Sequence, residues 1–365
     1  MKVALVDSEM GGHHANYLNA LIRVTNNVKG IKVVLILPEI SKFKKLNNKN
    51  IILYKLKFPV RKNILKYLID RLKWFFIVKK IIIKEQVQVV HFLTGDSFYQ
   101  LAGIFFSDLK KACKKIIVTQ HNIPVGYLKF YLFRKFSKKV NKIVVHTEFM
   151  KKRLCRRRIK NIMVIDYPSF HNTMIMEKNR AREQLVLPKD KIILLALGEA
   201  RYHKGLDILL LALQEVMYSY CLVIAGEEEY FTKEFIANCS KNIKGDLVIR
   251  LEHIIDKEFG WYVDASDCII LPYRKTFQGA SGPMVEAVWR RKLIIGPSHG
   301  SIGDLINNYN LGYVFKTENS KDLARVINKY LLNPYNWKEV NKAKFYRGRL
   351  DTAIFGMKYV KLYTE

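Results

Sequence analysis

The feature that most constrains this chain is a regular alternation of short, β-branched apolar runs with longer amphipathic stretches. The first half contains KVALVD, KVVLIL, VQVVHFL, KIIVTQH and KIVVHT, and the second contains KIILLALG, CLVIAG, DLVIRL, DCIILPY and KLIIGP. Apolar runs of this length between helical patterns are typical of buried parallel strands in βα units. Since 365 residues are enough for two hydrophobic cores, the sequence predicts an α/β protein with two Rossmann-like, doubly wound domains.

The segment NIMVIDYPSFHNTMIMEKNR separates the two halves of this pattern. Its Tyr-Pro-Ser sequence precedes a helical stretch, and we place the hinge near Pro168. The predicted domains are residues 1–168 and 169–340, followed by a helical segment at 341–365. Ligands of open α/β sheets bind beyond the carboxyl ends of the strands, so two such domains facing each other would form one cleft.

The charge is strongly positive, with 63 Lys and Arg against 32 Asp and Glu and a formal net charge of +31. This excess indicates an anionic partner, and nucleic acid and anionic lipid are both candidates. No zinc spacing or RNP-like run supports nucleic acid. Phe58–Gln86 mixes Lys and Arg with Trp74, Phe75 and aliphatic residues, as do residues 126–142. We therefore expect an anionic membrane surface as a partner, although helices that flank a sheet in a basic protein have the same pattern.

Cysteine usage and the N-terminus bear on location. The five cysteines are odd in number and show no CxxC spacing, which disfavours a disulfide framework or zinc site. The N-terminal MKVALVDSEMGG lacks the long apolar region of a signal peptide, and no apolar run approaches the length of a membrane span. We expect a cytoplasmic protein, peripheral at the inner face of a membrane.

Two loops in the first half follow predicted strands. In DSEMGGHHANYL, Gly12 would let the backbone approach a ligand, and His13 and His14 are candidates for the acceptor side. The alternative is a tight turn with two surface histidines. In TQHNIP, His121 stands at a strand end, and its alternative role is a hydrogen-bonded structural histidine.

Two loops in the second half suit phosphate. In LGEARYHKGLDILLLAL, Arg201 and Lys204 precede a helix and could hold a diphosphate, or could form a solvated basic loop. In FQGASGPMVEAVWRRKLIIGP, Ser281 and Gly282 open a helix whose N-terminus would attract an anion. Glu286, one turn later, could accept hydrogen bonds from vicinal hydroxyls such as those of a ribose. A nucleotide is the ligand that satisfies both features.

Two aspartates precede the last of these loops, in DASDCIILPY. Asp264 and Asp267 are most simply a helix-end and a turn residue. No third ligand accompanies them to complete a metal site.

The second half resembles the C-terminal half of the retaining GT-B glycosyltransferases of glycosyltransferase family 4. The resemblance rests on LGEARYHKGLDILLLAL, LVIAGEEEY, DASDCIILPY, QGASGPMVEAVWRRKLIIGP and GSIGDLI, in that order and spacing, over residues 190 to 335. The first half is similar only in its GG loop, its TQHN and its βα rhythm. The resemblance implies a GT-B architecture with a central cleft, a nucleotide-sugar donor, retention at the anomeric carbon, and a C-terminal segment that crosses back to the first domain.

The resemblance also implies roles for individual residues. Lys204 matches a lysine that contacts the donor diphosphate, and Glu286 matches the second glutamate of the E-x7-E motif, which binds the ribose. His121 matches a histidine near the transferred sugar, and Gly12 would lie in the loop that approaches the donor phosphates.

Two positions depart from the family pattern. Gln278 stands where the first glutamate of E-x7-E contacts the donor sugar, and its amide can still hydrogen-bond hydroxyls without a charge. Glu199 replaces the usual arginine, and Arg201 could take its place. Charge that develops on the departing diphosphate would be stabilised by Arg201, Lys204 and the N–H groups at Ser281 and Gly282. This arrangement requires no metal or other cofactor.

The resulting hypothesis is a retaining hexosyltransferase that moves a sugar from a UDP-, GDP- or ADP-sugar to a lipid-linked or glycan acceptor, in polysaccharide or glycolipid biosynthesis. A sugar-nucleotide epimerase of the same fold is one alternative, since it would bind the donor and need no acceptor. A catalytically weak glycan-binding subunit is another, motivated by Gln278. The charge alone suggests a third, a nucleic-acid-binding protein.

Overall fold

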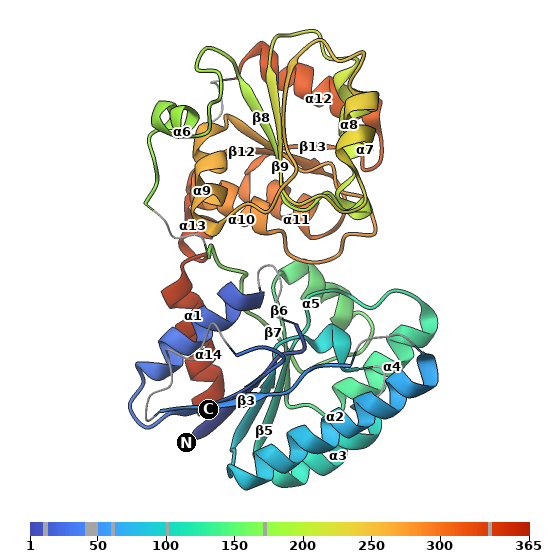
Figure 1. Cartoon of the computed structure of the whole chain (residues 1–365), viewed down its shortest axis with the longest axis vertical. Coiled ribbons are helices and arrows are strands. Elements are labelled where there is room, and N and C mark those ends of the chain that lie inside the picture. The colour runs from blue at the N-terminus through green and yellow to red at the C-terminus, as the bar shows by residue number, and fades with distance from the viewer. Residues whose placement is uncertain (10–13, 41–49, 60–62, 100–101, 171–173, 335–337) are drawn as a thin grey trace. The chain divides into compact units, whose positions relative to one another are not determined.

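The chain folds into two units, each built around a parallel sheet with helices on both faces (Figure 1). Unit 1 comprises residues 1–166 and 352–365, and unit 2 comprises residues 167–351. The predicted class, two Rossmann-like α/β domains, is confirmed. The computed structural model describes the chain apart from residues 10–13, 41–49, 60–62, 100–101, 171–173 and 335–337.

The chain passes between the units twice. The first passage lies between Asp166 and Tyr167, and the second between Asp351 and Thr352. The sequence placed these boundaries at Pro168 and at residue 341.

Unit 1 contains seven parallel strands in the order β3-β2-β1-β4-β5-β6-β7. The chain reverses its direction of travel across the sheet between β1 and β4, where Val3 pairs with Val33 on one side and Val89 on the other. The strands are β1 (Lys2–Val6), β2 (Lys32–Leu37), β3 (Ile51–Lys55), β4 (Val89–Phe92), β5 (Lys115–Thr119), β6 (Lys142–Val145) and β7 (Ile162–Val164).

The helices of unit 1 form two layers (Figure 1). One layer packs α3 between α2 and α4, and the other packs the C-terminal helix α14 against α1. Asn63 begins α2 by accepting a hydrogen bond from the Lys66 N–H, and Thr147 begins α5 by accepting one from the Met150 N–H. The helices are α1 (His14–Asn26), α2 (Ile64–Lys84), α3 (Ala102–Ala112), α4 (Tyr127–Ser137), α5 (Glu148–Cys155) and α14 (Thr352–Thr364).

The burial of two aromatic residues of α2 corrects part of the membrane prediction. Trp74 and Phe75, expected in a membrane interface, are only 2% and 4% exposed. They pack with Ala4 and Val6 of β1 in the core of unit 1. The pattern of alternating basic and aromatic residues was correct for a helix, but these two aromatics belong to the side that covers the sheet.

Unit 2 contains six parallel strands in the order β10-β9-β8-β11-β12-β13. The chain reverses between β8 and β11, where Leu194 pairs with Leu222 on one side and Cys268 on the other. The strands are β8 (Ile193–Leu197), β9 (Cys221–Ala225), β10 (Asp246–Arg250), β11 (Cys268–Ile270), β12 (Leu293–Pro297) and β13 (Gly312–Phe315).

The helices of unit 2 also fall into two groups that pack among themselves. Helix α7 contacts α8 and α12, whereas α9 and α10 contact each other along with α6 and α13. The helices are α6 (Lys178–Gln184), α7 (Leu206–Leu213), α8 (Lys233–Cys239), α9 (Asp256–Ala265), α10 (Gly282–Trp289), α11 (Gly300–Tyr309), α12 (Ser320–Leu332) and α13 (Asn341–Gly348).

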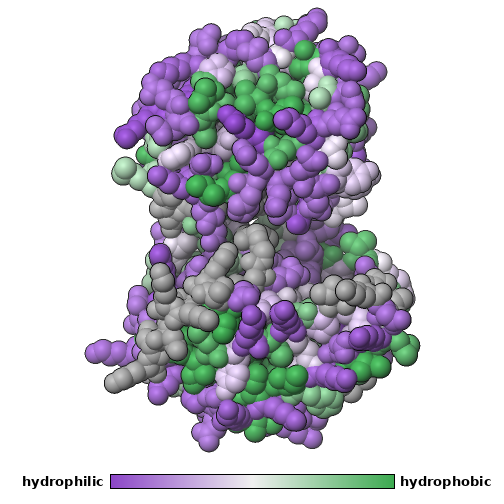
Figure 2. All heavy atoms as spheres, viewed as in Figure 1, coloured by the Kyte–Doolittle hydropathy of each residue, from purple (hydrophilic) through white to green (hydrophobic). Residues whose placement is uncertain are grey.

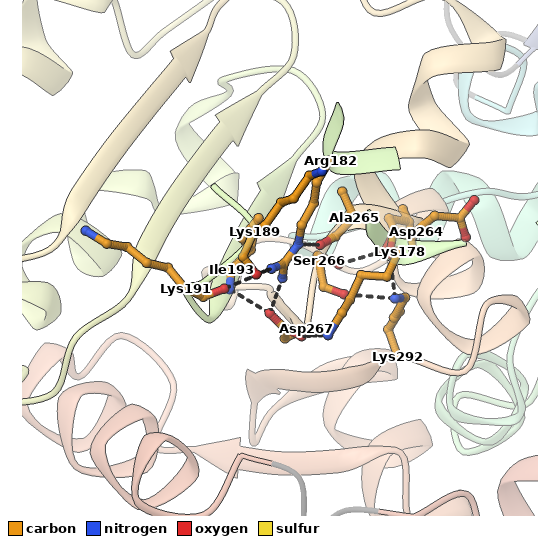
Figure 3. A network of polar contacts seen from close by, with 11 residues as sticks. Lys178, Arg182, Lys189, Lys191, Ile193, Asp264, Ala265, Ser266, Asp267 and Lys292 are labelled. Carbon is orange, nitrogen blue, oxygen red and sulfur yellow. Dashed lines mark hydrogen bonds and ion pairs between the residues drawn. The ribbon is translucent and has the colours of Figure 1, made fainter. Parts of the chain in front are cut away.

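An ion-pair network ties α6 to the amino ends of β8 and β11 (Figure 3). Asp267, directly before β11, accepts hydrogen bonds from the Arg182 guanidinium at 2.6 Å, from Lys178 Nζ at 3.0 Å and from the Ile193 N–H at 2.8 Å. Arg182 also donates to the Ala265 carbonyl at 3.0 Å. Both members of the Arg182–Asp267 pair are buried. A buried pair of this kind needs such additional hydrogen bonds to offset its desolvation.

A second part of the network anchors the end of α9. Asp264 pairs with Arg290 at 2.5 Å, and Lys292 Nζ donates to the carbonyls of Asp264 and Ser266 at 2.7 and 2.8 Å. Burial lowers the pKa of Lys292 to about 8, although Asp264 and Asp267 act to raise it. The sequence placed Asp264 and Asp267 correctly at a helix end and a turn, but did not identify their partners.

Candidate functional site

A small pocket of about 10 Å³ lies at the carboxyl ends of β8 and β11 in unit 2. It is lined by residues that include Gly198, Glu199, Lys204, Pro272 and Tyr273. These two strands are the neighbours between which the chain reverses direction. Ligands of open α/β sheets bind at this kind of position, because the loops on either side separate and leave a crevice.

Lys204 is the last residue of a short 3-10 helix, Tyr202–Lys204, which follows strand β8. The next residue, Gly205, has a left-handed backbone with φ of +67°, and a Cβ there would overlap the Pro272 carbonyl oxygen. Glycine is therefore required at this position. The tight turn brings Lys204 Nζ to 2.6 Å from the Tyr273 hydroxyl.

Tyr273 connects Lys204 to the start of α10. Its hydroxyl lies 3.1 Å from Ser281 Oγ, so Lys204, Tyr273 and Ser281 form one chain of polar contacts. A Cβ on Gly198 would be 3.8 Å from Lys204 Nζ and 3.6 Å from the Pro283 ring. The structure thus brings together two of the predicted diphosphate contacts, Lys204 and Ser281.

The N-terminus of α10 is open on one side. Ser281 caps the helix, with its Oγ 3.4 Å from the Met284 N–H. Among the described residues, a Cβ placed on Gly282 would meet no heavy atom within 4 Å apart from its chain neighbours and the backbone of its own helix. Backbone N–H groups in the first turn of a helix lack partners within the helix and attract anions. In α10 this applies to the start of the turn, because Pro283 has no N–H and the Met284 N–H bonds Ser281. The open space at Gly282 therefore suits a phosphate group.

Glu286, predicted to bind a ribose, is buried in this structure with 2% of its surface exposed. The Ser169 hydroxyl lies 2.9 Å from each of its two carboxylate oxygens. The Arg290 guanidinium is 3.8 Å away on the same helix. The ribose role of Glu286 stays a prediction.

Arg201 and Gln278 have partners that the sequence did not indicate. Arg201 forms ion pairs with Glu199 and, at 2.6 Å, with Glu229. The Gln278 amide nitrogen donates to the Lys275 carbonyl, which a glutamate carboxylate could not do. This contact gives a local reason for the amide at position 278. The donor contacts of both residues stay predictions.

Unit 1 carries the remaining predicted residues at the carboxyl edge of its own sheet. The His121 backbone N–H donates to Asp96 at 2.9 Å, and its Nε2 lies 2.9 Å from the Leu93 carbonyl. Because a carbonyl only accepts, Nε2 carries the proton of this contact. The His121 ring also lies near the rings of Tyr17 and His146, with centroids 5.6 and 5.1 Å away.

Asp96 is a candidate site residue that the sequence analysis missed. Besides the His121 N–H, it accepts hydrogen bonds from Gln120 Nε2 at 2.7 Å and from the Asn122 N–H at 3.2 Å. Burial raises the pKa of Asp96 to about 7, while the backbone donors act in the opposite direction. Its position in FLTGDSF, directly after a predicted strand, was the available signal.

His14 lies beside two carboxylates at the start of α1. Its Nδ1 is 3.4 Å from Asp7, and its Nε2 is 3.5 Å from Glu9. Burial acts to lower the pKa of His14, but the nearby carboxylates outweigh it and raise the pKa above its ordinary value. Its ring centroid is 5.6 Å from that of His121. Gly12 and His13 lie outside the described residues.

Two family models match the chain, one in each half. Residues 14–166 match Glycosyltransferase Family 4, and residues 177–346 match Glycosyl transferases group 1. No protein of curated function matches the sequence.

Several solved structures have a similar fold over the full chain. Sucrose-phosphate synthase from Thermosynechococcus elongatus is 15% identical with a TM-score of 0.74, and the match covers 100% of this chain and 98% of that one. Anabaena Alr3699/HepE in complex with UDP is 13% identical with a TM-score of 0.73, and both chains are fully covered. The lipopolysaccharide outer core galactosyltransferase WaaB is 13% identical with a TM-score of 0.70, and 100% and 99% are covered.

At identities of 13 to 15% the structural matches establish the fold alone. Both family models describe glycosyltransferases, and they establish that the protein is a glycosyltransferase. The chain therefore belongs to the glycosyltransferases of GT-B type, with a first half of the family 4 kind and a second half of the group 1 kind.

Proposed function

We propose that this glycosyltransferase is a retaining hexosyltransferase that moves a sugar from a nucleotide-sugar donor to a lipid-linked or glycan acceptor, at the cytoplasmic face of a membrane, in polysaccharide or glycolipid biosynthesis. The observation that carries the proposal is the convergence of Lys204, Ser281 and the open N-terminus of α10 at the reversal point of the unit 2 sheet.

The electrostatics of Lys204 favour a diphosphate. Among the described residues no carboxylate forms an ion pair with Lys204, and the neutral Tyr273 hydroxyl holds its Nζ instead. Its charge is therefore available to an anion, whereas Arg201 would have to exchange Glu229 for one. The Anabaena protein with the same fold has been solved with UDP and with UDP-glucose, which supports a uridine nucleotide as the first donor to test.

The chemistry follows from where charge develops. The bond between the anomeric carbon and the phosphate oxygen breaks, and a bond from the acceptor hydroxyl oxygen to that carbon forms. The negative charge appears on the departing diphosphate, where Lys204 and the α10 N-terminus stabilise it most in the transition state. The acceptor proton passes to the leaving phosphate oxygen, so attack occurs on the face that the phosphate leaves and configuration is retained.

Membrane association is proposed through the exposed side of α2. Apolar and lysine side chains alternate there at intervals of three and four residues, which places them along one face of the helix. Figure 2 shows hydrophobic and hydrophilic side chains mixed over the part of unit 1 that α2 occupies in Figure 1. No helix in the described part of the chain is long and apolar enough to cross a membrane. The exposed residues of α2 are Leu65, Lys66, Ile69, Lys73, Phe76, Ile77, Lys80, Ile83 and Lys84. Six of them, Lys66, Ile69, Lys73, Phe76, Lys80 and Ile83, follow this spacing of three and four residues.

A nucleotide screen followed by a transfer assay tests the activity. We expect one nucleoside diphosphate among UDP, GDP and ADP to raise the melting temperature, because a ligand that binds only the folded state stabilises it. The matching labelled nucleotide sugar should then transfer its label to a membrane lipid or glycan extract. Conversion of the donor to an epimer without an acceptor would contradict the proposal and favour a sugar-nucleotide epimerase.

The stereochemistry is tested separately. The proton NMR coupling at the newly formed anomeric linkage should match the configuration of the donor. A product of inverted configuration would reject the retaining mechanism and leave the transferase activity intact.

Vesicle co-sedimentation tests the membrane surface. Replacing Ile69 and Phe76 with Ser should weaken binding to anionic vesicles, and the loss should persist at high salt, because apolar insertion is not screened. The exposed Met217 of unit 2, replaced with Ser, is the matched control and should have no effect. If wild-type protein stays in the supernatant at low salt, the membrane proposal is wrong.

A further inference from the structure

The segment just after the chain enters unit 2 at Tyr167 covers the carboxylate of Glu286. Ser169 is fully buried, and Glu286 is 2% exposed. The Ser169 hydroxyl stands at the same distance, 2.9 Å, from both carboxylate oxygens. It therefore occupies the position in front of the carboxylate where a bidentate hydrogen-bond donor would bind.

Ser169 is also attached to both segments through which the chain passes between the units. It lies just after the first passage, at Asp166–Tyr167. Its backbone N–H donates at 2.9 Å to the carbonyl of Leu350, which lies just before the second passage, at Asp351–Thr352. One residue thus hydrogen-bonds the Glu286 side chain and joins the two connecting segments.

A ribose presents two adjacent hydroxyls, which can donate one hydrogen bond to each oxygen of a carboxylate. Ser169 presents one hydroxyl that is shared between the same two oxygens. Because Glu286 is buried behind this contact, a ribose can reach both oxygens only after the Ser169 hydroxyl has moved away.

We propose that Ser169 is an autoinhibitory place-holder: its hydroxyl occupies Glu286 in the absence of nucleotide, and the ribose hydroxyls displace it. The inference rests on the proposed nucleotide-binding role of Glu286. Displacement breaks the contact that fixes Ser169, so nucleotide binding loosens the hydrogen bond between the two connecting segments at Ser169 and Leu350.

The test compares Ser169→Ala with wild type for UDP and for 2′,3′-dideoxyuridine diphosphate, by calorimetry. Removing the hydroxyl should tighten UDP binding by about tenfold, the factor that corresponds to one hydrogen bond to a charged group. The dideoxy nucleotide cannot displace Ser169, so its affinity should not change. Ser266→Ala is the matched control, because it is a fully buried serine of the same unit whose hydroxyl bonds a carbonyl, and it should change neither affinity.

The outcomes separate three explanations. Weaker UDP binding by Ser169→Ala with unchanged dideoxy binding would overturn the place-holder and mean that Ser169 orients Glu286 toward the ribose. Equal changes for both nucleotides would overturn it in favour of a purely structural contact. Failure of wild type to bind UDP, GDP or ADP would instead overturn the proposed function on which the inference rests.

Hydrogen exchange gives a second readout that does not depend on a variant. Saturating UDP should speed exchange of the Ser169 amide, while the dideoxy nucleotide should leave it unchanged. Ligand binding alone slows exchange, so slower or unchanged exchange at this amide with UDP would also overturn the proposal.

Discussion

Asp267 and Lys204, at opposite edges of the unit 2 sheet, use charge in opposite ways. At the amino ends, Asp267 is surrounded by Arg182, Lys178 and a backbone N–H (Figure 3). At the carboxyl ends, Lys204 is held by a tyrosine hydroxyl, beside an open helix N-terminus. A charge whose partners are inside the protein contributes to folding, whereas a charge held by a neutral group is available to a ligand. Asp267 therefore serves stability at one end of the strands, and Lys204 is available for binding at the other.

The largest expected effect comes from removing the Asp267 carboxylate from the buried ion-pair network at the amino edge. Asp267→Ala leaves the buried Arg182 guanidinium without its carboxylate, which should lower the free energy of unfolding by about 3 to 5 kcal/mol. Urea denaturation measures the loss. Asp246→Ala is the control at the same edge, because its pair with Lys191 is exposed, and it should cost less than about 1 kcal/mol. Equal losses for the two variants would mean that the buried network has no special role.

The next largest effect is the loss of activity on removing Lys204 at the carboxyl edge. Lys204→Ala should reduce kcat/KM by the equivalent of about 2 to 4 kcal/mol, because it removes a cation from the departing diphosphate. Its urea midpoint should stay close to that of wild type. Lys275→Ala removes an exposed lysine from the loop after the neighbouring strand β11; it is the control and should retain activity. Near-normal turnover of Lys204→Ala with saturating donor would remove Lys204 from the site.

Glu286 should have a smaller effect, on binding. Glu286→Ala should weaken binding of the preferred nucleoside diphosphate by about 1.5 to 3 kcal/mol in calorimetry, through lost hydrogen bonds to a charged acceptor. Glu234→Ala removes a glutamate from the first turn of α8 and controls for a helix-dipole effect. An unchanged dissociation constant for Glu286→Ala would reduce its role to packing within unit 2.

The last predicted effect is a pH dependence at the amino edge. The pKa of Lys292 is about 8 in the folded protein, below the value of about 10.4 expected in the unfolded chain. Between these values the folded protein binds fewer protons, so the contribution of Lys292 to the free energy of unfolding rises with pH. The stability difference between wild type and Lys292→Met should therefore grow in favour of wild type from pH 8 to 10. A difference that stays constant with pH would show that Lys292 is solvated normally.

The sequence predicted the strands that carry clear apolar runs, but it missed β3, β7 and β13. All three lie at an edge of their sheet, where a strand has one neighbour. Whether an edge segment forms a strand depends on pairing with that neighbour more than on its own composition. Length was not the deciding factor, because β11 has only three residues and was predicted.

The candidate site was predictable in part for a related reason. Lys204 and Ser281 follow strands with clear apolar runs, so their common edge followed from the fold. Tyr273, which joins them, ends the DASDCIILPY segment, but nothing in the sequence indicated its contact with Lys204. Asp96, which holds the His121 backbone, also follows a strand and belongs to none of the segments that carry the family resemblance. The partner of Asp267 is 85 residues away in sequence, and the burial of Trp74 depends on which side of α2 faces the sheet. Neither long-range pairing nor helix orientation can be derived from local pattern.

Hydrogen exchange across unit 2, measured with and without the nucleoside diphosphate that the screen selects, tests the contrast between the two edges most directly. We predict slower exchange at residues 198–205 and at Ser281, Gly282, Met284 and Val285, where Lys204 and the α10 N-terminus would contact the diphosphate. We predict no change at residues 178–184 and 264–267. Protection confined to the amino edge, or to unit 1 alone, would contradict the assignment of nucleotide binding to the carboxyl ends of β8 and β11.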